Sequence, residues 1–112
     1  MSKINNTIGS FGGHQYRSCY HLLREAIEVG ISHQPDSPQM KVIWMEVCQK
    51  TGKKPGTVAR ALARAVEDLW DYGDSGKLIA YYQSWEKCQP TPQEFIFIVS
   101  RHLWLEDEAQ DV

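Results

Sequence analysis

Basic side chains gather in one stretch of the sequence, between Lys41 and Arg64. This window carries six lysines and arginines and one acidic residue, a net charge of +5, whereas the rest of the 112-residue chain carries −7. Such an asymmetry directs one face of a protein toward polyanions, even in a chain whose net charge is −2. The candidates for binding DNA phosphates and bases are Lys50, Lys53, Lys54, Thr57, Arg60 and Arg64.

Histidine and cysteine residues offer the other reactive groups. His14, Cys19 and His21 could share a metal ion, but their spacing matches no zinc pattern and no fourth ligand is evident. No nucleophile, base and orienting residue recur at a recognisable spacing, and the chain has no glycine-rich phosphate loop. We therefore expect no catalytic activity, no bound metal and no small-molecule cofactor.

The cellular compartment follows from the cysteines and from the apolar runs. Three cysteines at wide spacings argue against a disulfide framework and indicate structural thiols in a reducing compartment. No apolar run approaches the roughly 20 residues that a membrane span requires, and the first residues lack the apolar core of a signal peptide. A cytoplasmic protein without a membrane partner is expected.

Two predicted helices joined at Gly52 would position the basic side chains. Small Cys48 falls where such helices cross closely, and Gly52 suits a tight turn that needs a positive φ. Val58 would be the first apolar residue that the second helix buries. This spacing is typical of a helix-turn-helix motif. Because Pro55 fits a first helical position, the second helix is predicted over about residues 55–71.

This second helix is predicted to have an apolar face and a charged face. The apolar stripe comprises Val58, Ala61, Leu62, Ala65, Val66, Leu69 and Trp70. The outer face comprises Thr57, Arg60, Arg64, Glu67, Asp68 and Asp71. Basic residues at the start of a helix and acidic residues at its end each cost about 0.3–1 kcal/mol when exposed, because they oppose the macrodipole. The arrangement favours an anionic partner; alternatively the charges are only solvated, with Arg64 and Asp68 forming an i,i+4 pair.

The segments before the motif predict a lead-in and one long helix. Residues 1–13 contain glycine, serine and asparagine without helical periodicity, and a flexible lead-in is expected there. A helix is predicted from about Gln15 to Ser32, with an inward stripe of Tyr16, Tyr20, Leu23, Ile27 and Ile31. Asp36 or Ser37 would cap the first helix of the motif, with Pro38 early in it. That helix would bury Val42, Ile43, Trp44, Met45 and Val47.

The segments after the motif predict two more helices. A short one is expected over Lys77 to Trp85, and a final one is capped by Thr91 with Glu94 three residues later. The final helix would turn Phe95, Ile96, Val99 and Leu103 inward. No strand alternation is evident, so we predict an all-α bundle of five or six helices. The domain would span residues 14–106, with an acidic tail over 107–112.

In this order the helices resemble the carboxy-terminal DNA-binding domain of the master response regulator of sporulation initiation in spore-forming Firmicutes. The resemblance covers about Tyr20 to Leu105 and is carried by the helix-turn-helix together with LREAI from Leu23, KVIW from Lys41 and PTPQEFI from Pro90. It implies a helical bundle whose second motif helix enters the major groove of double-stranded DNA, and a homodimer on tandem sites. In the family a phosphorylated receiver domain precedes this one, and we expect none ahead of Gly9.

The resemblance places the groove-facing positions at Thr57, Arg60 and Arg64. Ala59 and Ala63 stand where family members usually present polar or charged side chains, so this chain would recognise another sequence or read fewer bases. We therefore expect a sequence-specific DNA-binding transcription regulator. The alternative is a protein-interaction module, an antirepressor or adaptor, built on a degenerate helix-turn-helix whose Ala59 and Ala63 surface contacts a protein.

Overall fold

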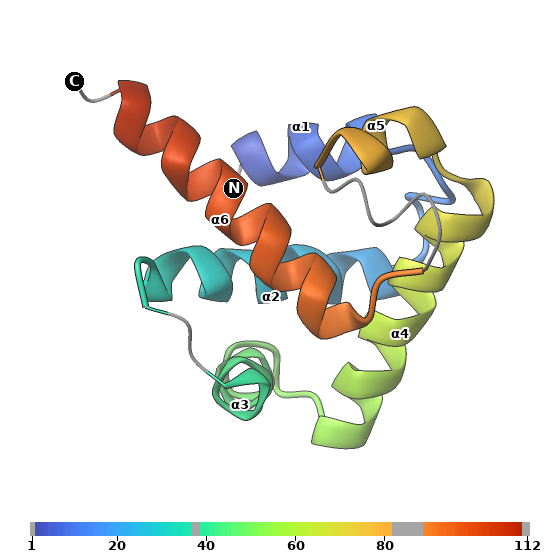
Figure 1. Ribbon diagram of the computed structural model, residues 1–112. Coiled ribbons are helices and arrows are strands. Elements are labelled where there is room, and N and C mark those ends of the chain that lie inside the picture. The colour runs from blue at the N-terminus through green and yellow to red at the C-terminus, as the bar shows by residue number, and fades with distance from the viewer. Residues whose placement is uncertain (1, 37–38, 82–88, 111–112) are drawn as a thin grey trace.

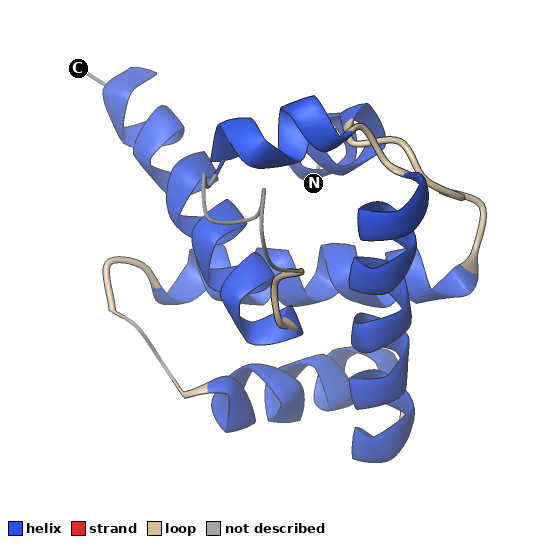
Figure 2. Cartoon of the chain, turned by 45° about the vertical axis from the view of Figure 1, so that its right-hand side comes forward, coloured by secondary structure: helices blue, strands red, loops and turns tan. Residues whose placement is uncertain are grey.

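Six helices make up the part of the chain that this computed structural model describes, which is residues 2–36, 39–81 and 89–110. They are α1 (Ser2–Ser10), α2 (Ser18–His33), α3 (Met40–Thr51), α4 (Pro55–Tyr72), α5 (Ser75–Tyr81) and α6 (Pro92–Gln110) (Figure 1). Figure 2 shows only helices and loops over these residues, so the all-α prediction is confirmed.

α2 lies at the centre of the fold and packs against α1, α3, α4 and α6 (Figure 1). Its buried side chains occupy positions at helical spacing, which are Cys19, Tyr20, Leu22, Leu23, Ala26, Ile27 and Val29. The crossing with α6 is close, because Gly30 of α2 faces the side chain of Ser100. Ser100, fully buried, donates a hydrogen bond from Oγ to the carbonyl oxygen of Ile27 at 3.3 Å. α2 therefore carries the core against which the motif helices are fixed.

The first residues of the chain form a helix, so the expected flexible lead-in is wrong. Ile4, Ile8 and Phe11 are buried, and the ring of Phe11 meets that of Phe95 edge to face with centroids 6.0 Å apart. These three residues recur at helical spacing, but Gly9, Gly12 and Gly13 obscured the pattern in the sequence. The packed domain thus begins well before residue 14.

The acidic end of the chain is also more ordered than expected. α6 continues to Gln110, so residues 107–110 of the predicted acidic tail are helical, and residues 111 and 112 lie outside the described residues. Lys3 of α1 pairs with Glu106 at 3.4 Å and with Asp107 at 2.7 Å. Glu106 and Asp107 therefore connect the last helix to the first one.

The boundaries of α2 and α3 correct three further predictions. α2 begins at Ser18, three residues later than predicted, and Tyr16 in the preceding turn is 84% exposed instead of buried. α3 has Gln39 as its N-cap without a side-chain hydrogen bond, so Asp36 does not cap it. The other cap candidate, Ser37, and Pro38 lie outside the described residues.

The buried face of α3 is narrower than predicted. Ile43 and Val47 are buried and Trp44 is partly buried against the core, as expected. Val42 and Met45, in contrast, are 38% and 53% exposed. A helix that packs on one side buries residues three or four apart, and Val42 and Met45 fall on the opposite side from Ile43 and Val47.

The last two helices agree with prediction where the structure describes them. α5 ends at Tyr81, with Leu78 buried and Ile79 partly buried, and the remainder of the predicted segment, to Trp85, lies outside the described residues. The inward residues of α6 are confirmed as buried, namely Phe95, Ile96, Val99 and Leu103. No helix among the described residues is long and apolar enough to cross a membrane.

The predicted cap of α6 is present. The backbone N–H of Glu94 donates to Oγ1 of Thr91 at 3.1 Å, and that hydroxyl lies 3.3 Å from the Glu94 carboxylate. Replacing Thr91 with alanine should therefore lower the free energy of unfolding by about 0.5–2 kcal/mol, as measured by chemical denaturation. Thr57→Ala is the matched control, because Thr57 is exposed within α4. Equal stability of the two variants would contradict the capping role.

Candidate nucleic-acid interface

α3 and α4 form the predicted helix-turn-helix. Gly52 ends α3 with φ +72° and ψ 9°, and its N–H donates to the carbonyl oxygen of Cys48 at 2.8 Å. This left-handed conformation is the one that favours glycine. Lys54 is the N-cap of α4 and Pro55 its first residue, as predicted. Val58 is fully buried, whereas Cys48 is partly buried against the core.

The two faces of α4 are confirmed with one exception. Every residue of the predicted apolar stripe is buried or partly buried against the core. Thr57, Arg60 and Arg64 are exposed, as are Glu67 and Asp71. Asp68 was predicted on the outer face, but only 3% of it is exposed. It pairs with His14 and Arg17 and not with Arg64, so the i,i+4 pair that belonged to the alternative interpretation is not formed.

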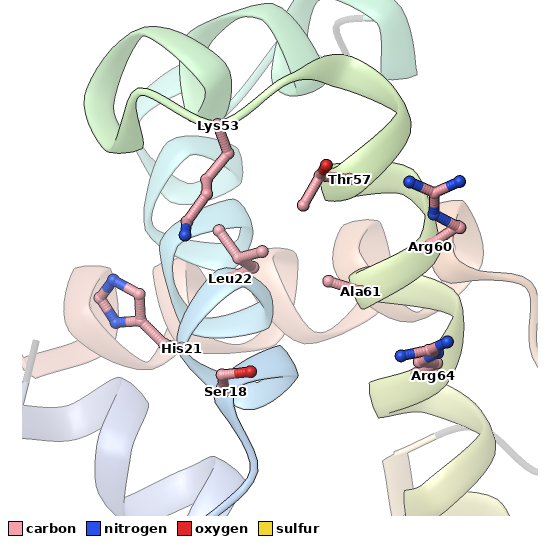
Figure 3. Close-up of a pocket in the computed structure, with 8 residues that line it drawn as sticks. All are labelled: Ser18, His21, Leu22, Lys53, Thr57, Arg60, Ala61 and Arg64. Atoms are coloured by element: carbon pink, nitrogen blue, oxygen red, sulfur yellow. The ribbon is translucent and has the colours of Figure 1, made fainter.

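An open cleft of about 780 Å³ separates the exposed side of α4 from the first turns of α2. Its lining comprises Ser18, His21, Leu22, Lys53, Thr57, Arg60, Ala61 and Arg64. In Figure 3, His21 and Lys53 lie on one side of the cleft, and Thr57 and Arg60 lie on the other. The cleft therefore brings together four of the six residues that the sequence singled out.

No acidic side chain in the described part of the chain neutralises the positive charge at this cleft. No acidic residue lines it, and among the described residues Lys53, Arg60 and Arg64 form no ion pair. A surface with several unpaired cations and no nearby carboxylate has a positive local potential. Exposed cations without a protein partner are the groups that an anionic ligand would contact.

The other two candidates lie apart from the cleft lining. Lys54 is exposed at the start of α4, beside the cleft residue Lys53. Lys50 pairs with Glu25 at 2.9 Å and with Glu28 at 3.0 Å, both on α2. The hydrogen bond from Lys50 to Glu25 contributes most to raising the pKa of the lysine. Its charge is thus compensated within the protein, which the sequence did not reveal.

A buried carboxylate on α4 holds this helix to the loop before α2. Asp68 Oδ2 accepts hydrogen bonds from the backbone N–H of His14 at 2.7 Å and from the hydroxyl of Tyr20 at 2.5 Å. Asp68 Oδ1 lies 2.7 Å from Nδ1 of His14 and 3.3 Å from the guanidinium of Arg17. We call this group of residues, His14, Arg17, Tyr20 and Asp68, the Asp68 cluster.

The hydrogen bonds within the Asp68 cluster keep the carboxyl of Asp68 ionised and the hydroxyl of Tyr20 neutral. Burial alone would raise the pKa of Asp68, but the hydrogen bonds from Tyr20 and His14 outweigh it and lower the pKa to about 2. Burial, followed by the hydrogen bond to Asp68, raises the pKa of Tyr20. Asp68 is therefore ionised and Tyr20 neutral at physiological pH. The sequence does not reveal this cluster, because Asp68 and His14 are 54 positions apart.

The residues considered for a metal site do not come together. His14 contacts Asp68, Cys19 is buried on the core side of α2, and His21 lies at the cleft. Within the described ranges no three histidine, cysteine or acidic residues are arranged to hold a metal ion.

With the helices and the cleft described, the chain can be compared with known protein families. The family described as "Sporulation initiation factor Spo0A C terminal" matches residues 4–103, nearly the whole chain. The chain belongs to this family. The match begins within α1, which supports the finding that the packed domain starts before residue 14. This family comprises DNA-binding domains of sporulation regulators, and it is not a family of enzymes.

Proposed function

We propose that this chain is a sequence-specific transcription regulator that inserts α4 into the major groove of double-stranded DNA. The observation that carries the proposal is the group of exposed cations on α4 and the turn before it, Lys53, Arg60 and Arg64, which form no ion pair among the described residues. An α-helix fits the major groove, where each base pair presents a distinct pattern of donors and acceptors.

The candidate DNA contacts divide into two roles, according to whether they lie within α4 or in the turn before it. Thr57, Arg60 and Arg64 recur at spacings of three and four, so they share the side of the helix that would face the bases. Lys53 and Lys54 precede the helix, where they would contact the sugar-phosphate backbone. Lys50 is left out of the proposed contacts because it is paired with two glutamates of α2.

The departures from the family pattern limit how many bases are read. Ala63 is exposed and Ala59 partly exposed on α4, and neither can donate a hydrogen bond from its side chain. We infer that base reading is concentrated at Thr57, Arg60 and Arg64. Binding as a homodimer on tandem sites remains part of the proposal and rests on the family resemblance.

Contacts to DNA phosphates can be recognised from how the affinity for DNA changes with salt concentration. Alanine at Lys53 or Lys54 should weaken binding to cognate and random duplexes alike and should reduce the slope of log affinity against log salt by about one. Fluorescence anisotropy across a salt series measures both quantities. Lys77→Ala is the matched control, because Lys77 is an exposed lysine on α5 outside the cleft.

Two outcomes would separate the proposal from its alternative. If the Lys53 variant lost affinity only for the cognate duplex, its assignment to the backbone would be wrong. If the protein bound neither duplex at any salt concentration, the protein-interaction module would be favoured over DNA binding.

A further inference from the structure

α4 presents an apolar edge to the cleft, apart from its cationic side chains. Thr57 and Ala61 are four residues apart, so they lie one above the other on the same side of the helix. Both line the cleft, and in Figure 3 they project from α4 toward α2, where Leu22 lies across from them. Arg60 lies on the other edge of α4 in the same view. We call Thr57 and Ala61 the apolar edge of α4.

The apolar edge is open to a ligand. Thr57 is exposed and Ala61 is partly exposed, whereas Leu22 is only 5% exposed. The side chain of Thr57 forms no hydrogen bond within the described part of the chain, so no protein group competes with a ligand for it. The edge therefore offers two methyl groups, one from each residue, to a group that enters the cleft.

The position of Thr57 fits contact with a base. It is the third residue of α4, and in helix-turn-helix proteins the residues near the N-terminus of the second helix contact the base edges. Every base presents hydrogen-bonding groups in the major groove, but only thymine adds an apolar group there, the methyl on C5. The methyl group of Ala61 cannot form a hydrogen bond, so the partner that it can recognise is an apolar one.

We propose that the apolar edge of α4 recognises a thymine through its C5-methyl group. The inference rests on the proposed function, because it requires α4 to lie in the major groove. It divides α4 into two edges with different chemistry: the guanidinium of Arg60 binds guanine, and the methyl groups of Thr57 and Ala61 contact thymine. Cytosine and uracil lack the C5-methyl group, so the apolar edge discriminates against both.

The decisive measurement compares thymine with uracil, because the two bases differ only by this methyl group. A cognate duplex is first selected from a random pool, and each of its thymines is then replaced singly by deoxyuridine. In fluorescence anisotropy the affinity of the wild-type protein should fall roughly 3- to 5-fold at one thymine position, which is the effect of burying one methyl group. The same replacements in a random duplex should leave the affinity unchanged.

Two substitutions of Thr57 separate its methyl group from its hydroxyl group. Thr57→Ser keeps the hydroxyl and loses the methyl, so its affinities for the thymine and uracil duplexes should agree within about twofold. Thr57→Val keeps the methyl and loses the hydroxyl, so it should retain the wild-type preference for thymine. Arg60→Lys changes the other edge of α4 and is the control, which should also retain that preference. Thr57 and Arg60 are both exposed, so all three variants are expected to fold as wild type does.

Three results would overturn the inference. One is a wild-type protein that binds its cognate duplex equally well with uracil at every thymine position. Another is a Thr57→Val variant that loses the preference for thymine while Thr57→Ser keeps it, which would assign the contact to the hydroxyl group. The third is a selection that fixes no A·T base pair in the bound sequence. Failure of the wild-type protein to bind any duplex, cognate or random, would instead reject the proposed function.

Discussion

Replacing Asp68 with alanine is expected to lower the free energy of unfolding by about 2–4 kcal/mol, a large effect for a residue that resembles a surface charge in the sequence. The hydroxyl of Tyr20 is buried and donates to this carboxylate, and His14 donates to it from its backbone and its ring. Without Asp68 these donors lose a charged acceptor where water does not readily replace it. The measurement is urea denaturation followed by circular dichroism.

Two further variants make the cause of this loss identifiable. Glu67→Ala changes the neighbouring exposed carboxylate on the same helix and should alter stability by no more than about 0.5 kcal/mol. Tyr20→Phe removes one donor while keeping the buried ring, and should cost less than Asp68→Ala. If Glu67→Ala and Asp68→Ala were equally stable, we would conclude that the carboxylate of Asp68 does not hold α4 to the loop before α2.

The pH dependence of the unfolding free energy, compared between wild type and Asp68→Asn, provides an independent check of the Asp68 cluster. The pKa of Asp68 is lowered from 3.8 to about 2 in the folded protein, so the carboxylate stabilises the fold fully above about pH 4. This contribution is lost as pH falls toward 2. The difference in unfolding free energy between wild type and Asp68→Asn should therefore be constant near neutrality and shrink below about pH 4. A constant difference down to pH 2.5 would contradict the lowered pKa.

Arg60→Ala should weaken binding to the cognate duplex by about 1–3 kcal/mol and relax the preference at one base position. Arg60 is exposed at the second turn of α4, lines the cleft and has no ion-pair partner among the described residues. Its planar guanidinium can bind O6 and N7 of guanine together. The cognate sequence is first obtained by selecting bound duplexes from a random pool, and the selection is then repeated with the variant.

Two control variants show whether the effect of Arg60→Ala comes from a lost contact with a base or from the loss of one positive charge. Arg60→Lys keeps the charge but loses the two-pronged donor, so it should bind scrambled DNA as wild type does and lose part of its cognate affinity. Arg101→Ala removes an exposed arginine from α6 and should leave the selected sequence unchanged. If Arg60→Ala lost the same factor on cognate and scrambled duplexes, Arg60 would be a phosphate contact.

The sequence predicted the parts of the fold that are set by local periodicity and local turn chemistry. The apolar stripe of α4, its start at Pro55, the left-handed Gly52 and the Thr91 cap all follow from residues close together in the chain. Four of the six candidate DNA contacts meet at one cleft because three of them share one helix face and Lys53 immediately precedes that helix.

The features that were missed depend on contacts between distant segments. Asp68 occupies a position that looks solvent-facing, and only the arrival of His14 and Tyr20 makes it a buried acceptor. Lys50 likewise looks free until α2 brings Glu25 and Glu28 beside it. The helix at Ser2–Ser10 was hidden because its stability comes from packing Ile4 and Ile8 on the core and not from the propensities of its residues.

The charges on α4 change sign along its length, and this has a consequence for how long an operator can be. Lys53 and Lys54 precede the helix and Arg60 follows within it, whereas Glu67 and Asp71 are exposed toward its end. If α4 binds DNA as proposed, the duplex, which is negatively charged along its whole length, attracts the beginning of α4 and repels the end. The helix axis is therefore expected to incline steeply to the groove, with its tip inserted, and one copy should read only a short run of base pairs. Longer operators would have to be assembled from several copies of the chain placed along the DNA.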